Sequence, residues 1–216
     1  MGLVMEKRGP SRRAVVTASL TATGGLAVAA SLPKTARAEE DAAHLVSPAA
    51  TEYIPADELN AFVVVHPDNT VLVRSPHQEM GQGTSTALAM LLAEELGCDW
   101  SKVRVEYASA NRNAKSKNIY GRQMTVGSQG VRSSVGMMQQ AGASARVRLV
   151  LAAAKRWGVS PDNCSVSGGK VVHAATGRSL AYGDLCSEAA STAVAQEPAI
   201  KTPDQFTLVG KWTPRL

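Results

Sequence analysis

The chain has 216 residues, of which 44% are hydrophobic, and carries a formal net charge of +5. This length and composition fit one large globular domain or two small ones. The first 38 residues hold six basic side chains and one acidic one, so the rest of the chain, with 17 of each sign, is neutral. The positive charge therefore belongs to a leader, and we expect no nucleic-acid partner.

Residues 1–38 have the form of an export signal. Arg12 and Arg13 precede a mildly apolar stretch, and Ala36-Arg37-Ala38 forms an A-x-A cleavage site. Paired arginines before a weakly apolar core are typical of the twin-arginine route, which exports folded proteins, often with a cofactor inserted. We expect cleavage after Ala38 and a periplasmic protein. A signal-anchor helix is the alternative, disfavoured because the apolar stretch is short and contains two glycines.

Residues 39–59 lack a hydrophobic period and are expected to form a linker or arm. A domain is then predicted over 60–160, beginning with a hairpin of 61–65 and 71–74. A turn containing Gly81-Gln82-Gly83 leads into a helix that is capped by Thr84 or Ser85 and ended by Gly97. Glu94 and Glu95 are interpreted as a solvated helix face. His77 borders the turn and could line a site, but a surface imidazole is the favoured interpretation.

The next elements are a strand over 103–107 and a polar loop over 108–120, whose Arg112, Lys115 and Lys117 are interpreted as solvated. A second glycine-rich turn spans 121–128 and leads into a long helix over 130–157 with a stripe of small and apolar residues. Residues 161–216 are predicted to extend the same domain with a hairpin turned by Gly168-Gly169, a short strand at 178–180, a helix from Tyr182 and a strand at 206–210. This order indicates an α+β or α/β fold.

The three cysteines, Cys98, Cys164 and Cys186, are widely spaced and form no C-x-x-C pair, which argues against an iron–sulfur cluster or structural zinc. They are interpreted as small buried hydrophobes, with one disulfide left open. The sequence also contains no G-x-S-x-G, no H-E-x-x-H, no P-loop and no dinucleotide fingerprint. What remains is two glycine-rich turns that each precede a helix. Such turns let main-chain N–H groups approach an anionic ligand, so the two are interpreted as cradles lying side by side.

Three segments carry a family resemblance. They are Glu-Met-Gly-Gln-Gly-x-x-Thr-Ala-Leu-Ala-Met-Leu-x-Ala-Glu-Glu-Leu-Gly at 79–97, Val-Arg-Val-Glu at 103–106 and Tyr-Gly-x-Gln-Met-Thr-x-Gly-Ser at 120–128. At this spacing the chain resembles the molybdopterin-binding subunit of the xanthine dehydrogenase and aldehyde oxidase family, in particular the exported isoquinoline 1-oxidoreductase beta-subunit type. The resemblance extends from about Asn60 to Leu216. It implies an α+β fold, a mixed sheet with packed helices, as part of a molybdopterin-binding domain.

The resemblance also implies that the two turns hold a pyranopterin and its phosphate or nucleotide tail, with the Gln82 amide hydrogen-bonded to the cofactor. The cofactor-binding residues carried over by motif are Gly81, Gln82 and Gly83 in the first turn and Gly121, Gln123, Met124, Thr125, Gly127 and Ser128 in the second. Arg122 and Val126 stand where relatives tend to have glycine.

The activity implied by the resemblance is hydroxylation of an N-heteroaromatic or aldehyde carbon with water as the oxygen source. It implies a molybdenum cofactor, in the cytosine dinucleotide form, a [2Fe–2S] small subunit and a cytochrome as electron acceptor. The family's catalytic glutamate lies near the far end of a much longer subunit, and nothing here matches it. We therefore expect no catalytic residue and no metal ligand in this chain, and no activity from it alone.

The leading interpretation is thus the N-terminal portion of a molybdenum hydroxylase large subunit, either completed by a second chain or produced by a truncated gene. The alternative is a non-catalytic exported module that keeps the fold and binds a partner or small ligand.

Overall fold

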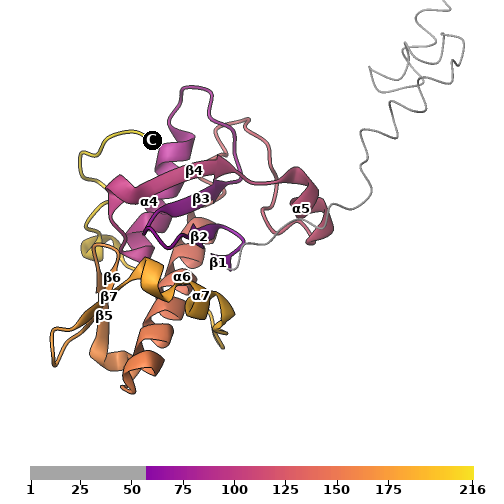
Figure 1. Ribbon diagram of the computed structural model, residues 1–216. Helices are drawn as coiled ribbons and strands as arrows, with labels where there is room; N and C mark the ends of the chain where they lie inside the picture. Colours follow the sequence, from indigo (N-terminus) through magenta and orange to yellow (C-terminus); the bar gives the residue numbers. More distant parts are fainter. Residues whose placement is uncertain (1–56) are drawn as a thin grey trace, which may run out of the picture. The chain divides into compact units, whose positions relative to one another are not determined.

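The computed structural model describes residues 57–216, and the predicted leader and most of the predicted linker lie outside the described residues. A four-stranded mixed sheet is the first feature of this part of the chain (Figure 1). Its strands are β1 (Glu58–Asn60), β2 (Val63–Val65), β3 (Val71–Ser75) and β4 (Val103–Tyr107), in that spatial order. The first three strands pair antiparallel and β4 pairs parallel with β3, because helix α4 (Thr84–Leu96) carries the chain back between them.

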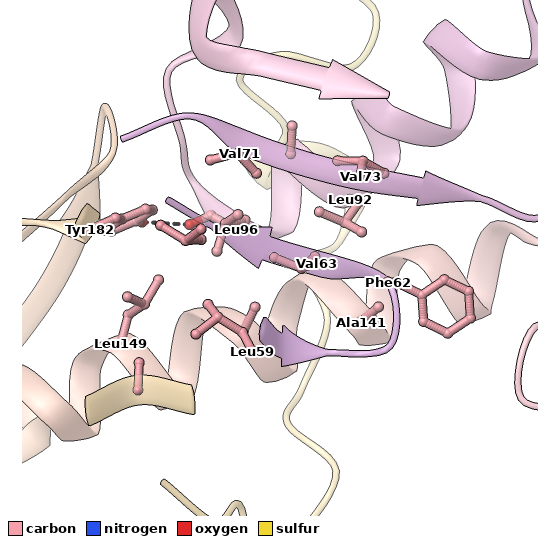
Figure 2. Close-up of a cluster of buried hydrophobic side chains, with 14 of the residues drawn as sticks. Leu59, Phe62, Val63, Val71, Val73, Leu92, Leu96, Ala141, Leu149 and Tyr182 are labelled. Carbon is pink, nitrogen blue, oxygen red and sulfur yellow. Dashed lines mark hydrogen bonds between the residues drawn. The ribbon is translucent and has the colours of Figure 1, made fainter. Parts of the chain in front are cut away.

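Two helices supply most of the remaining core. Helix α6 (Val135–Trp157) packs on α4, and the apolar side chains of both meet those of the sheet. Figure 2 shows Val63 and Val73 of the sheet in the same cluster as Leu92 of α4. The predicted sheet and the two long helices are confirmed, and the architecture is α+β with a mixed sheet.

The two helices lie close together at Gly142. A Cβ atom placed on this glycine would lie 2.3 Å from the main-chain oxygen of Leu92 and 2.8 Å from Cβ of Glu95. No side chain larger than hydrogen fits against a main-chain carbonyl at that distance. The small-residue stripe predicted for this helix is therefore a contact surface for the backbone of α4.

A small antiparallel sheet of β5 (Cys164–Ser167), β6 (Lys170–His173) and β7 (Ser179–Ala181) follows α6, and helix α7 (Tyr182–Ser191) comes next. The predicted Gly168-Gly169 turn is confirmed, since both residues have positive φ between β5 and β6. Tyr182 ties this region to the end of α4 because its hydroxyl donates to the Leu96 carbonyl at 2.7 Å (Figure 2). In the described part of the chain, no helix has the length and apolarity that crossing a bilayer requires.

Several sequence predictions about element limits were wrong. Helix α6 begins at Val135 rather than at 130, because residues 131–134 form turns in which the Ser134 amide donates to the Val131 carbonyl. The predicted polar loop at 108–120 contains helix α5 (Ala110–Lys115) and ends at the buried Tyr120.

The short 3-10 turns are η1 (Trp100–Lys102), η2 (Pro161–Asn163) and η3 (Pro203–Gln205).

Arg112 of α5 is not a solvated side chain. Its guanidinium donates to both carboxylate oxygens of Glu58, at 2.8 and 2.5 Å, and Arg74 of β3 donates to the same carboxylate at 2.5 Å. The Glu58 side chain is only 5% exposed. Two planar cations around one buried anion fix α5 and β3 against β1, and Glu58 lies at the end of the segment predicted as a linker.

The largest correction concerns Glu94 and Glu95, which are 2% and 0% exposed rather than solvated. Glu94 accepts main-chain N–H bonds from residues 207–209 at 2.9, 2.6 and 3.0 Å and pairs with Lys201 at 2.6 Å. Glu95 accepts from the Lys201 amide and from Arg146. Residues 206–210 therefore form no strand: their amides bond to a carboxylate of α4 instead of to a neighbouring strand.

We expect Gly142→Ala to destabilise the chain by about 2 kcal/mol, because the added methyl group must displace the α4 backbone and this cost exceeds the better helix propensity of alanine. Chemical unfolding followed by circular dichroism measures the change. Gly136→Ala is the matched control: it lies in the same helix with nothing within 4 Å of its added Cβ, so it should leave stability unchanged or raise it. Equal stability of the two variants would contradict the close approach.

The C-terminal segment should loosen in acid. Burial raises the pKa of Glu94, but the hydrogen bond from Lys201 and the amides of Leu208 and Val209 outweigh it and hold the pKa at about 2. A carboxyl group whose pKa is lowered in the folded state stabilises the fold at pH values above its ordinary pKa of 4.5. This stabilisation is lost as the pH falls from 4.5 to 2. The unfolding free energy of wild type should fall between pH 7 and pH 3. This fall should be about 2 kcal/mol larger than the fall in Glu94→Gln.

Glu188→Gln serves as the control for this acid experiment. Glu188 pairs with Arg156 on the surface, where its side chain is 53% exposed, so its loss should change stability little. If Glu94→Gln and Glu188→Gln show the same dependence on pH, the buried carboxylate does not hold the segment.

Candidate functional site

The first glycine-rich turn lies where the sequence predicts it, between the end of β3 and the start of α4. Gly81 and Gly83 have φ values of 96° and 85°, in the left-handed region that glycine reaches without steric cost. Gly83 is the residue before the first turn of α4. With these two left-handed residues around Gln82, the N–H groups of Gly81, Gly83 and Ser85 point toward the same side chain.

These N–H groups bond to the side chain of Glu79. Its Oε1 accepts from the amides of Gly81 and Gly83, both at 2.8 Å, and its Oε2 accepts from the Ser85 amide at 3.0 Å. The hydrogen bonds from Gly83 and Ser85 are the main cause of the lowered pKa of this carboxyl group. The helix is thus capped by Glu79, and the prediction of a Thr84 or Ser85 cap was wrong.

The side-chain amide of Gln82 also bonds within the turn. Its Oε1 accepts from the Met80 amide at 2.6 Å, while its Nε2 donates to the Gln78 carbonyl at 3.1 Å and to the Thr84 hydroxyl at 2.9 Å. Gln82 therefore stiffens the turn, and its predicted hydrogen bond to a cofactor stays a prediction.

His77 joins the first turn to the second. Its Nδ1 lies 3.0 Å from the Met124 carbonyl oxygen and its Nε2 lies 2.9 Å from the Ser134 hydroxyl. The ring is buried, so the interpretation of His77 as a surface imidazole was wrong. A second link lies next to it, where the Thr125 hydroxyl accepts from the Gln78 amide at 2.9 Å and donates to the Gln78 carbonyl. The two turns lie side by side because of these bonds.

The residues predicted for the second turn fall into two groups. Gly121 and Gln123 face the preceding segment: the Gly121 carbonyl accepts from Asn113 at 2.9 Å, and the Gln123 amide donates to the Ala108 carbonyl at 2.7 Å. Met124 is partly exposed and holds His77 through its carbonyl. The second group, Thr125, Gly127 and Ser128, lines a hollow shared with the first turn.

This hollow has a volume of about 370 Å³. It is lined by Met80, Gln82 and Thr84 from the first turn and by residues 125–131 from the second. Within residues 57–216, no acceptor takes a hydrogen bond from the amides of Gly127 and Ser128, which both have positive φ. The amides of Gly81, Gly83 and Ser85 at the first turn thus have the Glu79 carboxylate as acceptor, whereas those of Gly127 and Ser128, which line the hollow, have no acceptor within residues 57–216.

Sequence reasoning missed Glu79 and His77 as organisers of this site. An acidic side chain five residues before a helix, across a glycine-rich turn, is a signal that could have identified Glu79, since anions stabilise helix N-termini. The position of His77 beside the turn allowed a role at the site, but its partner Ser134 lies 57 residues away and could not be identified locally. Among the described residues, no group of three or more His, Cys, Asp or Glu side chains is placed to hold a metal ion.

The chain is similar to parts of longer proteins. It is 40% identical over 141 residues to the beta subunit of isoquinoline 1-oxidoreductase from Brevundimonas diminuta, covering 62% of this chain and 17% of that protein. It is 35% identical over 121 residues to the membrane-bound aldehyde dehydrogenase (pyrroloquinoline-quinone) of Gluconacetobacter polyoxogenes, covering 56% of this chain and 15% of that one. It therefore spans less than a fifth of the length of these curated relatives.

Among solved structures, quinoline 2-oxidoreductase from Pseudomonas putida 86 matches with a TM-score of 0.44 and 20% identity, over 58% of this chain and 15% of that one. The sequence pattern of one family covers most of the chain, from residue 18 to residue 214, and its description is a molybdopterin cofactor-binding domain. This chain therefore belongs to the molybdopterin cofactor-binding domain family.

Proposed function

We propose that this chain is the N-terminal, cofactor-binding part of a molybdenum hydroxylase large subunit and is inactive by itself. The observation that carries the proposal is the convergence of two glycine-rich turns on one hollow in a chain of the molybdopterin cofactor-binding family. The inactivity rests on the family resemblance, whose catalytic glutamate matches no residue of this chain.

The second turn fits a ligand of this kind. A hollow of about 370 Å³ falls within the range of small-molecule sites in proteins. The amides of Gly127 and Ser128, which have no acceptor among the described residues, are donors suited to phosphate oxygens. We infer that these amides hold the phosphate of the cofactor. At the first turn, a hydrogen bond donated to the cofactor by Gln82 Nε2 must replace its bond to Gln78 or Thr84, whereas Oε1 has one lone pair left to accept a bond.

When bound, the molybdenum cofactor would supply hydroxylation of an N-heteroaromatic or aldehyde carbon with water as the oxygen source. The residues of this chain would bind and orient it. His77 and Thr125 keep the two turns in register, so that both contact one ligand. The exposed side chains of Met80 and Val126 lie at the rim of the hollow, where we place the remainder of the large subunit.

The proposed assembly contains three further components. We infer a cytosine dinucleotide form of the cofactor, a [2Fe–2S] small subunit that receives the electrons, and a cytochrome that accepts them from it. We place the complex in the periplasm, exported folded by the twin-arginine route with cleavage after Ala38. These inferences rest on the resemblance and on the leader sequence.

Molybdenum and pterin analysis tests the proposal directly. The chain should be purified from its host both alone and together with the products of neighbouring genes. We expect molybdenum and pterin to co-purify in near-equal amounts with the complex and to be depleted in the chain alone. Their absence from both preparations would refute the proposal and favour a non-catalytic exported binding module.

Gln82→Ala should lower pterin occupancy of the complex about tenfold, because the turn loses the hydrogen bonds that stiffen it together with the proposed cofactor contact. Fluorescence of the oxidised pterin measures occupancy. Gln140→Ala is the control, since the Gln140 amide of α6 donates to the Pro198 carbonyl away from both turns. Equal pterin occupancy in the two variants would show that Gln82 does not contribute to cofactor binding.

A further inference from the structure

The first turn already contains an anion. Both oxygens of the Glu79 carboxylate are engaged by main-chain N–H groups, two on Oε1 and one on Oε2, at 2.8 to 3.0 Å. Three converging amides next to a helix N-terminus are the arrangement that proteins use to bind phosphate or sulfate. Here the chain supplies the negative group itself, from a residue two positions before Gly81.

Other contacts keep the carboxylate in this position. The Glu79 amide donates to the Tyr107 hydroxyl at 3.2 Å, which anchors the start of the turn to β4. The Arg215 guanidinium lies 3.7 Å from Oε1 of Glu79 and 3.4 Å from the Gly81 carbonyl oxygen. The side chain of Glu79 is 24% exposed, so most of its surface is covered by these partners.

Three amides at the first turn therefore differ from two in the second. The amides of Gly81, Gly83 and Ser85 already have an anionic acceptor. Those of Gly127 and Ser128 donate no hydrogen bond within residues 57–216. A second anion at the first turn would have to displace a covalently attached carboxylate, whose effective concentration is high because the loop to Gly81 is so short.

We propose that Glu79 is a positioning residue that acts as the built-in anion of the first turn and excludes the anionic group of a ligand from the amides of Gly81, Gly83 and Ser85. The first turn then meets a ligand through the side chains of Met80 and Gln82, and the anionic part of that ligand lies at the second turn. This last consequence rests on the proposed function, whereas the closure of the first turn by Glu79 does not.

Titration with inorganic phosphate tests the closure. Two-dimensional ¹⁵N–¹H spectra of the full chain report the amides of Gly81, Gly83 and Ser85 one by one. In wild type these three resonances should not respond to phosphate. In Glu79→Ala they should shift together and saturate, with phosphate binding at least about tenfold tighter than in wild type, because three donors have lost their acceptor.

Glu79→Gln supplies a second, more conservative test. Its carbonyl oxygen still faces Gly81 and Gly83, but its NH₂ group faces the Ser85 amide, so only the Ser85 resonance should respond to phosphate. This variant carries the test if Glu79→Ala does not fold. Glu106→Gln is the charge control: it removes a carboxylate that lines the same surface hollow as Glu79 without uncovering an amide, and it should leave the three resonances unmoved.

Two results would overturn the inference. One is a wild-type response at Gly81, Gly83 and Ser85 equal to that of Glu79→Ala. The other is a folded Glu79→Ala or Glu79→Gln whose three amides ignore phosphate. The titration contains no molybdenum cofactor, so a negative titration would not contradict the proposed function. Absence of molybdenum and pterin from the complex would likewise not contradict the closure of the first turn by Glu79.

Discussion

The close approach of α4 and α6 at Gly142 is the constraint on which the rest of this domain depends. The first glycine-rich turn leads directly into α4, and the second leads into α6 through the turns at 131–134. The distance between the two turns is therefore set by the packing of the two helices, which leaves 2.3 Å between the Leu92 carbonyl oxygen and a Cβ placed on Gly142. Rigid helices transmit that spacing to their ends, where His77 and Thr125 complete the register.

Buried carboxylates organise the parts of the chain that have little regular structure. Glu58 accepts hydrogen bonds from the guanidinium groups of Arg74 and Arg112. Glu94 accepts from the Lys201 ammonium group and from the three consecutive amides of residues 207–209. Each is an anion whose desolvation is compensated by several donors, so removal of one partner leaves a charge without compensation. In this way Glu94 fixes residues 201–209 along α4 without any strand pairing.

Glu79 uses the same chemistry at the site itself. A carboxylate that accepts three amide bonds stabilises a turn containing two left-handed glycines, and it does so at the end of the helix where an anion is electrostatically favoured. The turn consequently keeps its shape without a ligand. Among the described residues, the amides of Gly127 and Ser128 in the adjoining second turn have no such internal partner.

The sequence by itself determined the features that depend on neighbouring residues. The hairpin, the strand at 103–107, the left-handed glycines that end both long helices and the two turns all follow from local periodicity and from the conformational freedom of glycine. Only the tertiary structure decided the roles of His77, Glu94 and Arg112, whose partners lie 47 or more residues away along the chain. From sequence alone, a charged or polar residue is predicted to be solvated. The prediction fails where the fold brings a distant partner to that residue. Glu79 lies between these cases: the three amides that donate to its carboxylate are within six residues, but its role appears only when the backbone turns these amides toward it.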